Sequence, residues 1–74
     1  MFSMTVDLET DMAYVDLKLD IPIVRTVEVG RSLLANYDVD GDLVGVEILS
    51  LAALGRPDVV ADLTRLLDDR PVSD

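Results

Sequence analysis

Apolar and polar residues alternate along the first part of the chain, a period-two pattern that is typical of half-buried β-strands. Every second residue is apolar between residues 2 and 8, and again between residues 12 and 19. A polar connection of about four residues separates these two segments. Residues 23–29 are rich in β-branched side chains, and Gly30-Arg31 follows them as a turn. The pattern therefore predicts three strands in this region.

The clearest local signal is the pair Asp40-Gly41 between two apolar runs, residues 33–38 and 42–49, which is typical of a β-hairpin. A two-residue type I′ turn at Asp40-Gly41 gives the cleaner apolar face, and we favour it for that reason. That face would consist of Leu33, Ala35, Tyr37, Val39, Val44, Val46 and Ile48.

A second turn geometry also fits this hairpin. A type I turn with Gly41 as a left-handed bulge would pair Asp38 with Asp42. In that register one face of the hairpin would contain a different set of residues, namely Leu34, Asn36, Val44 and Val46. The sequence leaves the choice between the two registers open.

After residue 49 the pattern becomes helical. Residues 50–55 fit a single turn, and Pro57 suits the first position of a longer helix. An apolar stripe follows at helical spacing and consists of Val59, Val60, Leu63, Leu66 and Leu67. Arg70 lies near the predicted end of this helix, and Pro71 stops it. We expect the stripe to cover the sheet of its own subunit, with packing on another chain as the alternative.

These elements predict an α+β fold, with an antiparallel β-meander of about five strands over residues 2–49 and a C-terminal helical segment over residues 50–70. The 74 residues are enough for a single domain. A chain this short buries only roughly 60% of the surface that its unfolded form exposes. It has no cysteine, so no disulfide supports it, and half of its residues are apolar. We therefore predict a homodimer that buries further apolar surface.

The chain is acidic, with 15 acidic and 6 basic residues and a formal net charge of −9. An acidic surface repels nucleic-acid phosphates and anionic lipid, so we predict no direct nucleic-acid binding and no membrane association. A basic protein is the kind of partner that this charge would attract. The N-terminus lacks the features of a signal peptide, and no apolar run reaches the roughly 20 residues that span a bilayer. We therefore expect a cytoplasmic protein.

Groups that carry catalysis are scarce. The chain has no histidine and no cysteine, which removes the commonest general base and the commonest transition-metal ligands. No serine has a histidine to activate it, Lys18 is the only lysine, and the glycines are too scattered for a phosphate-binding loop. We predict a non-enzymatic protein with no catalytic residue, no cofactor and no resident metal.

Asp38, Asp40 and Asp42 have the spacing of the first ligands in a calcium loop. The loop also needs a glycine and a bidentate glutamate at fixed later positions, and here Gly41 and Glu47 each come two residues too early. Aspartate is also a common turn residue, because its side chain accepts hydrogen bonds from nearby backbone N–H groups. We therefore interpret this segment as a turn.

Glu28 and Glu47 each lie inside an otherwise apolar strand, where a carboxylate must be solvated, paired or functional. If they shared a sheet face with Asp38 and Tyr14, the four residues would form a carboxylate-rich patch. A polar sheet face with cross-strand basic partners is the simpler interpretation. Gly45, in the middle of its strand, indicates a bulge or a close approach of the backbone to another group.

Three segments in a fixed order resemble a known family. Residues 6–15 resemble a YD-x-x-x-D-x-x-Y opening, residues 25–29 an R-T-x-E strand, and residues 37–49 a D-x-D-G-x-x-V-G-I-E-I-L hairpin. Together they resemble the small prokaryotic family called domain of unknown function 2283. The chain differs in having Val6 where the family often has tyrosine.

The resemblance implies a small, β-rich, cytoplasmic domain with no established activity. It also singles out a set of family-pattern positions of unknown role, namely Asp11, Tyr14, Thr26, Glu28, Asp38, Gly41, Gly45 and Glu47. Their roles can be entirely structural.

Two functional hypotheses follow from the sequence. The first is a homodimeric protein-interaction module, and an antitoxin-like role against a basic partner is one version of it. The second is a small-ligand or metal-binding domain in which Glu28, Asp38 and Glu47 form the site.

Overall fold

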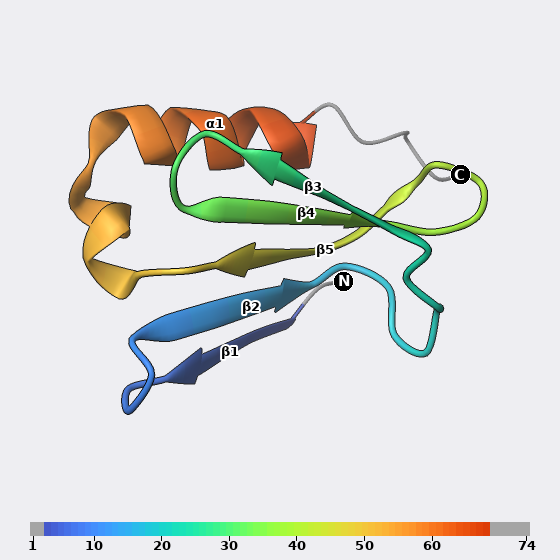
Figure 1. Cartoon of the computed structure of the whole chain (residues 1–74), viewed down its shortest axis with the longest axis horizontal. Coiled ribbons are helices and arrows are strands. Elements are labelled where there is room, and N and C mark those ends of the chain that lie inside the picture. Colours follow the sequence, from blue (N-terminus) through green and yellow to red (C-terminus); the bar gives the residue numbers. More distant parts are fainter. Residues whose placement is uncertain (1–2, 69–74) are drawn as a thin grey trace.

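The computed structural model describes residues 3–68 and contains a five-stranded antiparallel sheet with one C-terminal helix (Figure 1). The strands are β1 (Ser3–Asp7), β2 (Met12–Asp16), β3 (Arg25–Val29), β4 (Leu33–Tyr37) and β5 (Leu43–Ile48). A short 3₁₀ helix, η1 (Leu51–Gly55), leads into α1 (Pro57–Asp68). The predicted α+β fold is confirmed.

The strand order in the sheet is β1-β2-β5-β4-β3. The chain therefore runs as two antiparallel meanders, β1-β2 and β3-β4-β5, which join where β2 pairs with β5. Residues 17–24 carry the chain past the ends of β5 and β4 to the far edge of the sheet (Figure 1). This order leaves β1 and β3 as the two edge strands.

The β4–β5 hairpin has the type I turn in which Gly41 is a left-handed bulge and Asp38 pairs with Asp42. Our preference for a type I′ turn is therefore wrong. The backbone N–H of Asp38 donates to the carbonyl of Asp42 at 3.0 Å, and Gly41 has φ +83°. The Asp38 carboxylate stabilises this wider turn, because it accepts the N–H groups of Asp40 and Asp42 at 2.9 Å each.

A bulge one residue further along restores the apolar face that the other register predicted. Tyr37 pairs with Leu43, but the next pair is Asn36 with Gly45, so Val44 is an extra residue in β5. Beyond it, the sheet pairs Ala35 with Val46 and Leu33 with Ile48, and all four residues are buried. Two local irregularities thus cancel, and the alternation needed by the core is kept.

The hydrophobic core lies between one face of the sheet and the helices. Its central residues, Leu33, Ala35, Val46 and Ile48, are at most 1% exposed. Val59 of α1 and Ala53 of η1 close the core from the other side, with Leu63, Leu66 and Leu67 packed against it. The predicted apolar stripe therefore covers the sheet of its own subunit, except that Val60 points outward and is 42% exposed.

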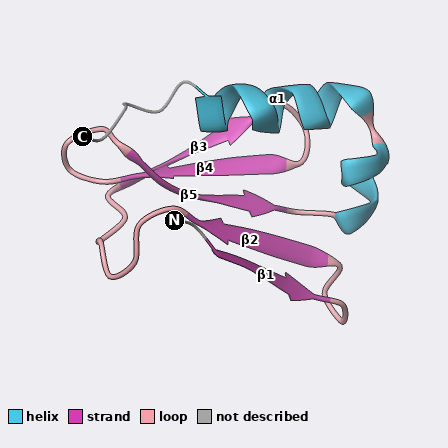
Figure 2. Cartoon of the chain, turned by 180° about the vertical axis from the view of Figure 1, so that it is seen from behind, coloured by secondary structure: helices cyan, strands magenta, loops and turns pink. Residues whose placement is uncertain are grey.

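The helix covers only part of the sheet. It runs along β3 and β4, whereas β1 and β2 lie away from it (Figure 2). Met4 and Val6 in β1 pair with Val15 and Ala13, so they lie on the same face as the core, but the helix does not reach them. The predicted positions of Phe2 and of the helix end at Arg70-Pro71 lie outside the described residues.

Candidate functional site

The sheet face opposite the helix is polar, and strand pairing arranges its residues in two rows. The first row, read across the sheet from β1 to β3, is Thr5, Tyr14, Glu47, Leu34 and Glu28. The second row is Ser3, Asp16, Gly45, Asn36 and Thr26. We call this surface the open face. It contains five of the family-pattern positions, which are Tyr14, Thr26, Glu28, Gly45 and Glu47.

Asn36 is the centre of a hydrogen-bond network on the open face. Its Oδ1 accepts the Thr26 hydroxyl at 2.7 Å, and its Nδ2 donates to the Tyr14 hydroxyl at 3.3 Å and to Glu47 Oε2 at 3.2 Å. The side chain is thereby satisfied, although the residue is only 1% exposed. A buried amide with all its bonds made fixes the groups that it contacts, because breaking any bond leaves a polar group without a partner.

Gly45 leaves room for Tyr14 in this network. A Cβ at Gly45 would overlap the Tyr14 hydroxyl and lie 2.7 Å from Cζ of the ring, and it would also lie 3.0 Å from the Val15 carbonyl. The end of the Tyr14 ring therefore rests directly on the backbone of β5. This contact explains the glycine in the middle of the strand, which the sequence interpreted as a close approach of the backbone.

A pocket of about 220 Å³ lies beside the network, at the end of the sheet where the β1–β2 turn is. Its polar lining comes from Thr5, Asp7 and Thr10 of the β1 strand and turn, and from Tyr14 and Glu47. Met12 and Ala13 complete the wall. Asp7 Oδ1 accepts the backbone N–H groups of Glu9 at 3.0 Å and Thr10 at 3.3 Å, which holds the turn in place.

The charges in this pocket are not neutralised by the described residues. Salt bridges within residues 3–68 involve Asp38 and Asp42 with Lys18, Asp58 with Arg56, and Asp62 with Arg65. Asp7 and Glu47 take part in none of them, and the pocket lining contains no basic residue. The residues that line the pocket therefore include two carboxylates, three hydroxyl side chains and an aromatic ring, although most of its exposed wall is apolar.

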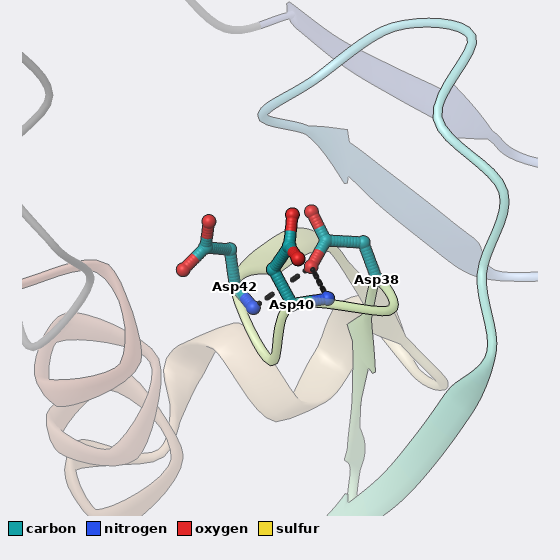
Figure 3. A group of neighbouring side chains, drawn as sticks. All are labelled: Asp38, Asp40 and Asp42. Atoms are coloured by element: carbon teal, nitrogen blue, oxygen red, sulfur yellow. Dashed lines mark hydrogen bonds between the residues drawn. The ribbon is translucent and has the colours of Figure 1, made fainter.

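The three aspartates of the hairpin lie close together, as Figure 3 shows, but two of them serve the turn and an ion pair. Their carboxylate oxygens lie within 4.8 Å of one another. One oxygen of Asp38 accepts the turn's two N–H groups, while the other lies 3.6 Å from Lys18 Nζ. Asp42 lies 3.2 Å from the same nitrogen. The ammonium group of Lys18 is thus the cation that this cluster holds.

These contacts also shift the acidity of the groups. Chiefly because it accepts the Asp42 backbone N–H, and with help from the Asp40 N–H and Lys18, the Asp38 carboxyl has a pKa below its usual value. The hydrogen bond to Asp42 raises the pKa of Lys18. Both shifts favour the charged forms, as expected for an ion pair built into a turn.

The structure does not bring together all the carboxylates that the sequence combined in one patch. Glu47 and Tyr14 are neighbours, but Glu28 is exposed and lies across β4 from Glu47, with Leu34 between them. Asp38 belongs to the hairpin turn instead. Among residues 3–68, the hairpin aspartates are the only acidic trio close enough to share a metal ion.

Two further family-pattern positions have structural roles at turns. Asp11 has φ +59° in the β1–β2 turn, its carboxylate accepts the Ser50 hydroxyl at 3.2 Å, and its carbonyl accepts the Leu51 N–H at 2.9 Å. It thus connects the turn to the start of η1. Gly41 provides the left-handed residue of the hairpin.

Asn36 is the residue of this site that the sequence analysis missed. A signal was present, because it is an amide inside the apolar run 33–38. In the sequence it stands out only through the alternative hairpin register, because its three partners, Tyr14, Thr26 and Glu47, come from three other strands. Polar residues within apolar strands are candidates for such networks.

The fold and this polar face define a small α+β domain in which a buried amide, Asn36, connects the side chains of one sheet face. A family model described as a protein of unknown function, DUF2283, matches residues 3–51. The chain belongs to this family. No curated protein and no solved structure matched it significantly. No helix among residues 3–68 is long and apolar enough to cross a membrane.

Proposed function

We propose that this protein is a non-enzymatic interaction module that forms a homodimer through the edge of β1. The observation that supports it is the apolar side of this strand, where Met4 is 48% and Val6 49% exposed although both lie on the face of the core. Burying such half-exposed side chains contributes about 1 kcal/mol each. An edge strand also has unpaired backbone groups that a second strand can pair with.

β1 has few of the features that prevent edge strands from pairing. Between residues 3 and 7 it contains no proline and no basic residue, its one charged residue, Asp7, is at the end of the strand, and its pairing with β2 is regular along its whole length. β3, the other edge strand, carries Arg25 and Glu28, which disfavour pairing with another chain. Of the two edges, β1 is therefore the better one for a second copy.

An antiparallel pairing of two β1 strands centred on Thr5 matches their side chains. Met4 of one copy would lie opposite Val6 of the other, which joins the apolar sides across the two-fold axis. Asp7 would lie opposite Ser3, so no two carboxylates face each other. The two sheets would then form one continuous sheet. An interface this small is weak, with a dissociation constant of about micromolar or higher.

Sedimentation velocity over a range of concentrations tests this proposal. We expect the wild type to dimerise and Val6→Lys to remain a monomer, because the substitution puts two like charges at the centre of the interface. Val39→Lys is the matched control, since Val39 is 82% exposed in the hairpin turn and distant from β1 in the sheet. A wild type that stays monomeric at millimolar concentration, or equal dimerisation of Val6→Lys, would contradict the proposal.

The predicted antitoxin-like version and the cytoplasmic location stay predictions of the sequence. The acidic open face supports a basic protein as the further partner of such a dimer, because a basic surface would neutralise the charge of −9. A small-ligand site made from Glu28, Asp38 and Glu47 has less support, since these residues lie on separate parts of the sheet.

A further inference from the structure

We propose that the pocket between the β1–β2 turn and β5 binds the guanidinium group of an arginine side chain presented by a basic partner protein. The pocket has a volume of about 220 Å³, which is large enough for this group and part of its aliphatic stem. This inference does not depend on the proposed homodimer, because Met4 and Val6, the side chains that the homodimer would bury, do not line the pocket.

Charge supports a cationic occupant. Asp7 and Glu47 line the pocket from different strands, and neither forms a salt bridge within residues 3–68. Of the five basic residues within residues 3–68, Lys18, Arg56 and Arg65 pair with other aspartates, and Arg25 lies 4.9 Å from the centre of the Tyr37 ring. With two carboxylates and no basic residue in its wall, the pocket attracts a positive group and disfavours an anion.

The network on the open face holds two walls of the pocket in position before any partner binds. Asn36 donates to Glu47 Oε2 at 3.2 Å and to the Tyr14 hydroxyl at 3.3 Å, and its own position is fixed by burial and by Thr26. Asn36 does not line the pocket and is a positioning residue. Groups fixed in this way lose little conformational entropy when a ligand arrives.

The chemistry of the wall favours guanidinium over ammonium. Tyr14 lines the pocket, its ring end is held against the backbone at Gly45, and a guanidinium plane stacks on aromatic rings. Its fork of N–H donors can bond a carboxylate in two places at once, and the pocket offers a carboxylate on either side, Asp7 from β1 and Glu47 from β5. A lysine ammonium is a compact point charge that makes fewer of these contacts.

Titration of the ¹⁵N-labelled protein with short peptides tests the inference. The probes are three acetylated and amidated pentapeptides that differ at a central residue between glycines, which is arginine, lysine or the neutral isostere citrulline. We expect the arginine peptide to bind with a dissociation constant of about 1 mM or below and to shift the amide signals of Asp7, Thr10 and Tyr14. The lysine peptide should bind at least about threefold more weakly, and the citrulline peptide should not bind.

Matched variants separate the pocket from general attraction to an acidic protein. Glu47→Gln and Asp7→Asn should each raise the dissociation constant of the arginine peptide about three- to fivefold. Glu28→Gln removes the same charge from the same face outside the pocket and should have no effect. Signal shifts spread over the whole acidic surface, or equal losses in all three variants, would overturn the inference. So would equal binding of the arginine and lysine peptides.

The position of Asn36 gives an independent readout. Asn36→Ala changes no residue that lines the pocket, but it removes the hydrogen bonds that hold Glu47 and Tyr14 in place. The variant should therefore bind the arginine peptide more weakly, while its amide spectrum should show that the protein is still folded. Val6→Lys should bind the arginine peptide as the wild type does, whatever its oligomeric state. Failure of the homodimer and failure of the pocket are therefore distinguishable results.

Discussion

The two faces of the central strands bury their residues equally well by different means. On the covered face, Val46 and Ile48 are completely buried between the sheet and α1. On the open face none of the helices within residues 3–68 covers the sheet, yet Asn36 is just as inaccessible, at 1% exposed. There the cover consists of neighbouring side chains, above all Tyr14 and Thr26, which both hydrogen-bond to the amide.

This difference indicates which interactions stabilise each face. The covered face is stabilised by the removal of apolar surface from water. Such a core tolerates apolar substitutions that keep its volume better than substitutions that change it. The open face is stabilised only while every polar group keeps its partner. A substitution on the first face should therefore reduce stability in proportion to lost volume, whereas one on the second should act through the bonds that it breaks.

The largest effect is expected from truncating the covered face. Ile48→Ala should lower the free energy of unfolding by about 2–5 kcal/mol, because it removes buried methyl groups and leaves a cavity below α1. In so small a domain this loss is a large share of the total stability. Urea denaturation followed by circular dichroism measures it. The control Val39→Ala, at a position 82% exposed, should change little, and an equally small change for Ile48→Ala would contradict the prediction.

A smaller effect is expected from breaking the open-face network. Asn36→Ala should lower the free energy of unfolding by about 1–3 kcal/mol, since it leaves the groups bonded to the amide without their partner. Thr26→Val removes only one of these bonds and should cost about 1 kcal/mol or less. If the two variants lost the same stability in a thermal melt, the network would not act through Asn36 as its centre.

The smallest effect concerns the hairpin turn and depends on pH. The pKa of Asp38 is lowered in the folded protein, so its charged form adds stability at neutral pH. That contribution is complete above the unfolded pKa of about 3.9 and is lost as the pH falls through the lower folded pKa. At pH 7 the wild type should therefore melt at a higher temperature than Asp38→Asn, and the gap should shrink below about pH 4.

The neighbouring residue provides the control for this pH effect. Asp40→Asn removes a carboxylate that accepts neither of the two N–H groups bound by Asp38. The difference in melting temperature between this variant and the wild type should therefore not shrink at acid pH. A constant difference between wild type and Asp38→Asn from pH 7 to pH 3 would mean that the turn does not depend on the charge of Asp38.

Local pattern predicted the elements of this fold well, because strands and helices have different hydrophobic periods. The alternation of Ala13 and Val15 placed β2, and Pro57 marked the start of α1. The hairpin was predicted in the right place with the wrong turn. Its geometry depends on the Asp38 side chain and on the extra residue Val44, neither of which changes the apolar pattern.

The candidate site was predicted only in part. Tyr14, Gly45 and Glu47 were singled out, and they lie together around one network. Asp38 was combined with them and proved to serve the turn. The pocket itself was out of reach, because Asp7 and Glu47 are distant in the sequence and line one pocket only through the pairing of β2 with β1 and β5.

The sequence by itself determined the class of fold, its strands and helix, its acidic character and its family, since each of these depends on the order of residue types along the chain. Only the tertiary structure decided the strand order, the partners of Asn36, the edge left open at β1 and the pocket beside Glu47. The physical reason is that strand pairing acts between distant segments, and a backbone hydrogen bond carries no information about which strand it joins.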